Sequence, residues 1–174
     1  QAAALTVDEA SALVGKLIAE INGVINSGAS ESAMYVRFED IFSRYADENF
    51  IALSALGPAG RQATPAQKAA FTTAFKRYLA VKYGKRFREF IGGKIEVTDA
   101  HPLKSFFEVV SVAKLQGSNP FDVRWQVSDK SGQNKFFNII IEGVNMLATE
   151  RAEIGALLDK NGGSIDKMTA ALKG

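Results

Sequence analysis

The chain has 174 residues, of which 47% are hydrophobic and 23% are charged, and its formal net charge is +2. A chain of this length fits one domain that buries about 70% of its extended-chain surface, and its composition is that of a globular protein. The absence of cysteine excludes disulfides, thiol catalysis and thiolate metal sites. A single histidine argues against a zinc site built from protein ligands alone. We therefore expect one domain over residues 1–174, with no metal and no cofactor.

The first residues, Gln1-Ala2-Ala3-Ala4, are typical of the run that remains after a signal peptide is removed at a small-residue site. A boundary chosen for expression explains the same start equally well. No apolar run approaches the roughly 20 residues needed to cross a bilayer, so we expect the mature chain to be soluble.

Three helices are predicted in the first third of the chain. Apolar residues at helical spacing follow a cap at Thr6 or Asp8 and continue to Ile25. A second helix is expected from about Glu31 to Tyr45, and a third over residues 46–56. The run Gly57-Pro58-Ala59-Gly60 then interrupts the helical pattern.

A long helix from Thr64 to about Ile91 is the most informative segment. Thr64-Pro65-x-Gln67 has the order of an N-cap, a first-turn proline and a capping-box residue. The apolar face rotates along the helix, and Gly84 lies at the change, where a bend is expected. A helix that curves around a ligand and one that covers an ordinary core fit this pattern equally well.

This helix also holds most of the positive charge. Residues 61–94 contain nine Lys or Arg and one acid, whereas residues 1–60 contain three basic and eight acidic residues. A cationic surface beside abundant apolar side chains suits a ligand that is anionic at one end and oily at the other.

From Lys94 onward the apolar period changes to two, which predicts four strands. The turn residues between the later strands favour an antiparallel meander. Two further helices, at about residues 149–159 and after Ser164, close the chain. We therefore predict an α+β fold in which helices pack on one face of a four-stranded, mostly antiparallel sheet. The four strands are expected at residues 94–99, 106–115, 121–129 and 135–142.

Known catalytic and nucleotide-binding motifs do not occur in the sequence. Adjacent acids such as Asp47 and Glu48 point in different directions on a helix and are expected to be solvated. His101 lies near Asp99 in a predicted loop, and no nucleophile is marked out as its partner. We expect no catalytic residues. An enzyme with a cone-shaped α+β fold stays open as an alternative, and it requires a buried polar dyad such as His101 with Asp99.

Several short segments occur in the order and at the spacing seen in one known family. They are Leu56-Gly57-x-x-x-Arg61-x-Ala63-Thr64-x-x-Gln67, Phe71-x-x-x-Phe75 through Leu79-x-x-x-Tyr83, Glu142-Gly143-Val144, and Arg151-x-Glu153 with a closing Leu172. Together they resemble the MlaC (toluene-tolerance) family over roughly Tyr45 to the C-terminus. The chain departs from the family pattern at Gly60, where Trp is usual, at Asn138, where Asp is usual, and at Asn145, where Ser is usual.

The resemblance implies a periplasmic phospholipid carrier that serves an ABC-type lipid-transport system in Gram-negative envelopes. It implies acyl tails held in an apolar cavity between sheet and helices, with the headgroup at the mouth. It also implies docking to an inner-membrane ABC complex and to an outer-membrane lipoprotein complex. A binding module whose basic helix contacts nucleic acid is a weaker alternative, because no exposed aromatic platform accompanies the charges. We expect no nucleic-acid partner.

The expected cavity lining comes from the long helix and from one face of the sheet. An ordinary packed core would use the same side chains. The lining residues are Phe71, Phe75, Leu79, Tyr83, Phe87, Val109, Val123, Trp125, Val127, Phe137, Ile139 and Ile141. The residues expected at the headgroup or rim are Arg61, Lys82, Lys85 and Arg86.

Overall fold

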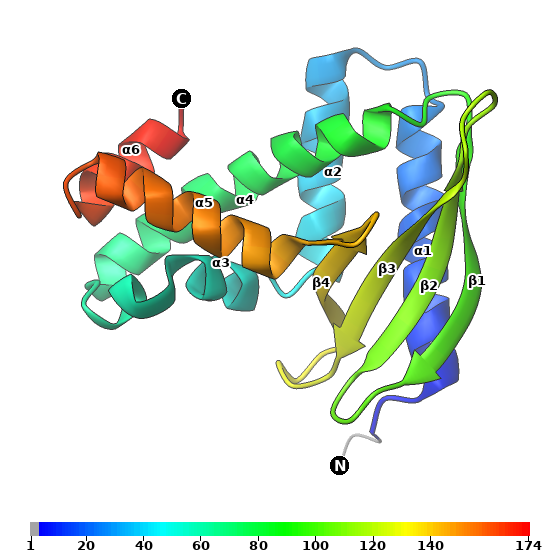
Figure 1. Cartoon of the computed structure of the whole chain (residues 1–174), viewed down its shortest axis with the longest axis horizontal. Coiled ribbons are helices and arrows are strands. Elements are labelled where there is room, and N and C mark those ends of the chain that lie inside the picture. The colour runs from blue at the N-terminus through cyan, green and yellow to red at the C-terminus, as the bar shows by residue number, and fades with distance from the viewer. Residues whose placement is uncertain (1–3) are drawn as a thin grey trace.

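The computed structural model describes residues 4–174, so the first three residues of the predicted signal-cleavage run lie outside the described part. Six α-helices and five β-strands make up that part (Figure 1). In order they are α1 (Val7–Ile25), α2 (Glu31–Tyr45), α3 (Glu48–Leu56), the 3-10 helix η1 (Gly57–Arg61), α4 (Pro65–Arg88), β1 (Lys94–Pro102), β2 (Phe107–Lys114), β3 (Phe121–Ser128), β4 (Lys135–Ile141), β5 (Val144–Asn145), α5 (Met146–Lys160) and α6 (Ile165–Leu172).

The strands form one sheet in the order β1-β2-β3-β4-β5, and every neighbouring pair is antiparallel. The α+β prediction is confirmed, but the prediction of four strands is wrong by one. The missing strand, β5, has only two residues, Val144 and Asn145, which is too short to show an alternating pattern. It turns the chain back along β4 immediately before α5.

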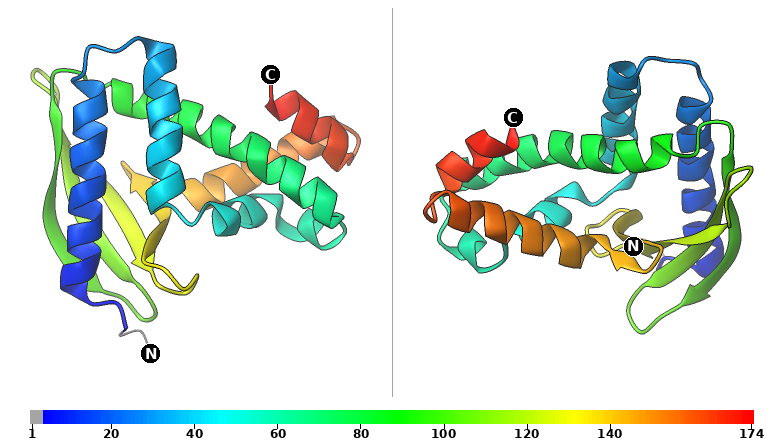
Figure 2. Two further views of the ribbon diagram at one scale, coloured as in Figure 1. Left: turned by 180° about the vertical axis from the view of Figure 1, so that it is seen from behind. Right: turned by 45° about the horizontal axis from the view of Figure 1, so that its top comes forward.

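The helices divide into two sets around this sheet. α1 lies along β1 and β2, and α2 packs beside it on the same side, as the view from behind shows (Figure 2). The remaining helices extend past the β4 edge of the sheet (Figures 1 and 2). We call α3, α5, α6 and the first half of α4 the helical arm. α4 connects the arm to the sheet layer by packing against α2, α3 and α6.

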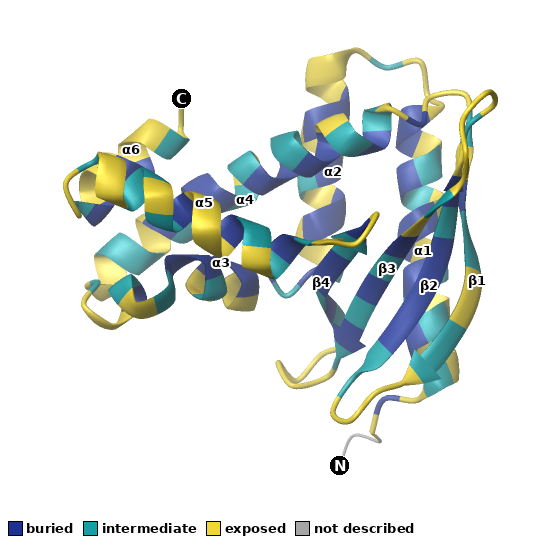
Figure 3. Cartoon of the chain, viewed as in Figure 1, coloured by how far each residue is buried: buried dark blue, intermediate teal, exposed yellow. Residues whose placement is uncertain are grey.

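Burial alternates along the central strand β3, as expected for a strand with one face in the core (Figure 3). Val109, Trp125 and Ile139 are cross-strand neighbours, and each is 1% exposed or less. The adjacent Glu108 and Gln126 carry the polar face and hydrogen-bond to each other. One apolar core runs from α1 and the sheet through α2 and α4 into the arm.

α4 is continuous through Gly84, and this glycine sits where α4 approaches α2. A Cβ at this position would lie 2.8 Å from Cδ2 of Phe38 and 3.0 Å from Cδ1 of Tyr35. The missing side chain therefore gives the rings of α2 room to lie directly against the α4 backbone.

No helix within residues 4–174 combines the length and the apolar character that a bilayer-spanning segment needs.

Candidate functional site

The predicted ligand-binding residues converge on α4, and local hydrogen bonds fix where this helix begins. Thr64 Oγ1 accepts from the Gln67 backbone N–H at 3.1 Å, and Gln67 Oε1 accepts from the Thr64 N–H at 2.9 Å. Pro65 occupies the first helical position. This capping box confirms the predicted start of the helix, and it sets the rotation that turns Phe71 and Phe75 inward.

The side chains predicted to line a cavity are mostly buried in the common core. They form two groups, one in the arm, where Phe71 stacks on Phe75 at 5.3 Å, and one at the sheet, where Phe87 stacks on Trp125 at 6.2 Å. Their burial agrees with the predicted inward face, and their role as cavity lining stays a prediction. The eleven buried members are Phe71, Phe75, Leu79, Tyr83, Phe87, Val109, Val123, Trp125, Val127, Ile139 and Ile141.

Phe137 is the predicted lining residue that lies outside this core. The register of β3 and β4 shifts so that Val127 pairs with Phe136, and it is Phe136 that is buried. Phe137 is half-buried and packs edge-on against Phe50 at 5.8 Å and Phe106 at 5.2 Å. The prediction that Phe137 shares the environment of Ile139 is wrong, because an irregularity of the β-bulge kind interrupts the alternation.

α4 meets α5 chiefly through long side chains, since its close backbone contacts are with α2, α3 and α6. Lys82 Nζ donates to Glu150 Oε2 at 2.7 Å and to Glu153 Oε2 at 2.6 Å. Arg86 Nη2 donates to Glu142 Oε1, in the turn before β5, at 2.6 Å. We call these three ion pairs the seam. They join α4 to the segment that runs from the β4–β5 turn into α5.

The carboxylate of Glu150 lies at the centre of the seam. Its side chain is 1% exposed. Tyr83 Oη donates to Oε2 of Glu150 at 3.0 Å, so this oxygen has two donors. The other oxygen, Oε1, has no hydrogen-bond partner among residues 4–174. Burial of an unpaired carboxylate oxygen costs free energy, and exposure of the seam to water would recover part of that cost.

The seam fixes the charge state of its partners. Burial, together with the charge of Glu150, raises the pKa of Tyr78 to about 12 and also raises the pKa of Tyr83. Burial lowers the pKa of Lys82, but its hydrogen bonds to the two carboxylates raise it by more. At neutral pH both phenols are therefore protonated and Lys82 is a cation.

The four residues predicted for the rim are not brought together. Lys82 and Arg86 belong to the seam, and Lys85, which precedes Arg86, is exposed. Arg61 is exposed in η1, before the start of α4. Lys82 lies 18 residues after the N-cap Thr64, which is about 27 Å along α4 at 1.5 Å per residue. Arg61 and Lys82 thus belong to different parts of the molecule.

Sequence reasoning overlooked Glu150, although a signal was present. Glu150 comes four residues after Met146 and four before Ile154, and these three are the buried residues of α5. A carboxylate on the apolar stripe of a helix indicates a buried charge with a partner. The partner, Lys82, is 68 residues away in the chain.

Two of the departures from the resembled family pattern contact each other. Asn138 is 2% exposed, and its Nδ2 donates to Asn145 Oδ1 at 3.2 Å. Asn138 Oδ1 accepts from the Leu147 N–H at 3.1 Å, and Asn145 Oδ1 accepts from the Ala148 N–H at 3.1 Å. The pair caps α5 and fastens its first turn to the polar face of the sheet.

His101 and Asp99 do not form the buried dyad that the enzyme alternative requires. The side chain of His101 is 36% exposed and that of Asp99 is 66% exposed, with Nδ1 and Oδ2 3.3 Å apart. His101 Nε2 also lies 3.2 Å from Glu108 Oε1. Within residues 4–174, no group of three His, Cys, Asp or Glu is placed to hold a metal ion.

An open groove of about 550 Å³ runs between α4 and α6 on the outside of the arm. Apolar and basic side chains line it together, and Lys82 belongs to both this groove and the seam. We call it the α4–α6 groove. Its lining residues are Ala74, Arg77, Tyr78, Val81, Lys82, Lys85, Glu153, Leu172 and Lys173.

These features define an α+β protein with an aromatic interior and an ion-paired seam that joins α4 to α5. The chain matches the family model described as MlaC protein over residues 12–174, and it belongs to that family. Its fold is similar to that of a phospholipid-binding protein from Ralstonia solanacearum, solved in complex with a phospholipid. The TM-score is 0.77 at 18% sequence identity, over 95% of this chain and 99% of the other.

Proposed function

We propose that this chain is a periplasmic phospholipid carrier, which encloses acyl tails and shuttles lipid between outer- and inner-membrane transport complexes. The observation that carries the proposal is the apolar interior that runs from the sheet along α4 into the arm, together with the seam beside it. Membership of the MlaC family and the phospholipid bound by a protein of the same fold support it.

Transfer of a phospholipid through water requires that its tails be covered. Each exposed CH₂ group costs roughly 0.8 kcal/mol, so one tail represents on the order of 10 kcal/mol. Rings such as Phe75, Phe87 and Trp125 can cover a tail without directional contacts. A carrier built this way selects weakly among acyl chains, and it requires no catalytic group.

Loading would proceed by separation of α4 from α5 at the seam. Separation breaks the side-chain pairs of Lys82 and Arg86 but leaves the helical and sheet hydrogen bonds intact. Once the tails are inside, the cations of the seam and the nearby Lys85 would face the anionic headgroup. Docking on an inner-membrane ABC complex or on an outer-membrane lipoprotein complex would bias the seam toward opening.

The first test is organic extraction of the purified protein followed by mass spectrometry. We expect phospholipid in near-stoichiometric amount, and a strong loss of it in F75D, which places a charge in the interior. F137D is the matched control, because Phe137 lies outside the core. Circular dichroism checks that both variants fold. A folded F75D that retains lipid like F137D contradicts the placement of the cavity.

A second test holds the seam shut. The chain has no cysteine, so K82C/E153C introduces the only two thiols, which a short bifunctional maleimide can bridge. We expect bridging to slow uptake of a fluorescent phospholipid from vesicles at least tenfold. Bridged E20C/R44C, which joins α1 to α2 at another ion pair, should exchange lipid normally. Equal rates in the two bridged proteins would show that lipid does not pass through the seam.

A further inference from the structure

The floor of the α4–α6 groove is an apolar stripe on α4. Ala74, Tyr78 and Val81 follow one another at spacings of four and three residues, so they lie on one face of the helix. Leu172 of α6 faces this stripe across the groove. Tyr78, Val81 and Leu172 are only partly buried, which leaves apolar surface uncovered along the groove.

The walls of the groove are predominantly basic. Arg77, Lys82, Lys85 and Lys173 line it, and Glu153 is the acid among the lining residues. Lys82 is paired with acids of α5, and Arg77 lies 3.6 Å from Glu39. Lys85 and Lys173 are exposed and form no ion pair within the described part of the chain. The groove therefore offers cations whose charge is not balanced within it.

The shape of the groove selects among possible ligands. From Ala74 to Lys85 the groove follows α4 for about 16 Å, or three helical turns. An enclosed pocket suits a small ligand, whereas this groove is open along its length. An acyl chain lying in it would stay partly in water, at roughly 0.8 kcal/mol per exposed CH₂. A second helix with an apolar face would cover the stripe and place its flanking residues over the cations.

We propose that the α4–α6 groove docks an acidic amphipathic helix of a partner protein. The apolar face of that helix packs on Tyr78, Val81 and Leu172. Its carboxylates pair with Lys85 and Lys173 at the two walls. Opposite charge along the rims sets the register and speeds association, while the apolar stripe supplies most of the affinity.

Docking has a consequence for the seam through Lys82, which lines the groove and also holds Glu150 and Glu153. A carboxylate that enters the groove competes for Nζ of Lys82 and weakens the attachment of α5. A docked partner thereby favours opening of the interior. This consequence rests on the proposed carrier function, whereas the docking itself does not.

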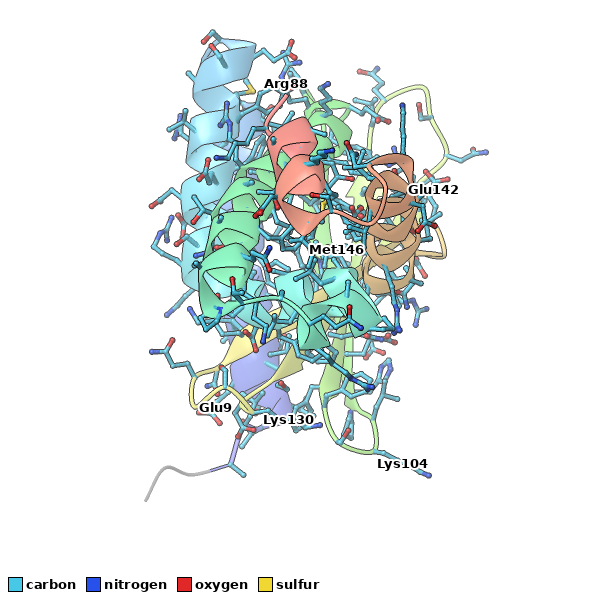
Figure 4. The ribbon with its side chains drawn as sticks, turned by 90° about the vertical axis from the view of Figure 1, so that its left-hand side faces the viewer. Glu9, Arg88, Lys104, Lys130, Glu142 and Met146 are labelled. Atoms are coloured by element: carbon cyan, nitrogen blue, oxygen red, sulfur yellow. The ribbon has the colours of Figure 1, made fainter. Side chains whose placement is uncertain are left out.

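The test uses a synthetic 18-residue helical peptide with leucines at positions i, i+3, i+4 and i+7 and glutamates on its flanks. Titrated into the isotope-labelled full chain, it should shift amide resonances of α4 and α6 and leave those of β1 and β2 unchanged. We expect K85E/K173E to weaken binding about tenfold. The matched control is K104E/K130E, which makes the same charge change at exposed hairpin turns at the opposite end from α6 (Figure 4).

Three results would overturn the docking proposal. One is equal weakening by the two charge-reversal variants, which indicates nonspecific attraction. Another is the same set of shifts produced by glycerol phosphate or by phosphatidylglycerol vesicles, which assigns the groove to lipid. The third is concentration-dependent self-association through these residues, which assigns it to a second copy of the chain. Lipid release is measured separately: if the peptide binds at the groove without accelerating release, the coupling through Lys82 is wrong and docking stands.

Discussion

Glu150 and Glu153 show how differently two carboxylates on one helix can act. Both accept from Nζ of Lys82, at 2.7 and 2.6 Å. The side chain of Glu150 is 1% exposed, whereas that of Glu153 is 52% exposed. An exposed ion pair is screened by water, but removal of one partner from a buried pair leaves polar groups without partners. In this case the hydroxyl of Tyr83 also loses its acceptor.

We therefore expect E150A to reduce the free energy of unfolding by about 2–4 kcal/mol, and E153A by less than about 1 kcal/mol. Urea denaturation of both variants under identical conditions measures the difference. Equal losses of unfolding free energy would mean that the burial of Glu150 does not strengthen its ion pair.

Elements with strong local signals could be predicted from sequence, and those fixed by distant contacts could not. α2 has the predicted bounds, and α4 begins where Thr64 and Gln67 predict, because capping depends on residues a few positions apart. α5 begins at Met146, three residues earlier than predicted, because its cap Asn145 is held by Asn138 of the sheet. The register shift that buries Phe136 in place of Phe137 depends on how β4 pairs with β3. The pattern of apolar residues within β4 alone cannot predict it.

The candidate site likewise has a part that local sequence predicts and a part that depends on distant contacts. The inward face of α4 followed from helical spacing, whereas the seam required knowledge of which helix lies opposite Lys82. The role of Gly84 is another case of this kind, since it depends on Tyr35 and Phe38 of α2. Sequence spacing shows only that a glycine occupies a helix interior, where alanine is favoured by roughly 1 kcal/mol.

A pair of glycine substitutions tests this packing. G84A should destabilise the protein by about 1–3 kcal/mol despite its better helix propensity, because the new methyl group meets the rings of Tyr35 and Phe38. The new methyl group of G155A, in α5, meets no atom within 4 Å beyond the neighbouring backbone of its own helix, so this variant should stabilise by up to about 1 kcal/mol. Thermal unfolding followed by circular dichroism measures both changes. A stabilised G84A would show that the packing between α2 and α4 has room for an added methyl group.

At the scale of the whole molecule, the arm is joined to the sheet layer by α4 and also by a short segment before α3. Ala46 forms a parallel bridge with Phe136, and the Asp47 N–H donates to the Phe136 carbonyl at 2.8 Å. The next residue, Glu48, is 6% exposed, and its Oε2 has no hydrogen-bond partner within residues 4–174. Burial raises the pKa of Glu48 from 4.5 to about 7, against the opposing charge of Lys76.

This carboxyl makes the stability of the molecule depend on pH. Between pH 4.5 and 7 the folded state holds a proton on Glu48 that the unfolded state has released. The stabilisation of the folded state by this bound proton is therefore complete below pH 4.5 and is lost as the pH rises through 7. We expect the wild-type protein to lose on the order of 2 kcal/mol more than E48Q between pH 4.5 and 7.5. Urea denaturation at the two pH values measures this difference, and identical pH dependence in E48Q would contradict it.

The single tryptophan of the chain stands at the interface between α4 and the sheet. Trp125 is 0% exposed, stacks on Phe87 and meets Phe136 edge-on at 5.3 Å, while its Nε1 donates to Ser111 Oγ at 3.0 Å. Since no other indole is present, the tryptophan emission of this protein originates at one point deep in the interior. The molecule thus contains its own optical probe, whose wavelength and lifetime respond to whatever occupies that space, without any attached dye.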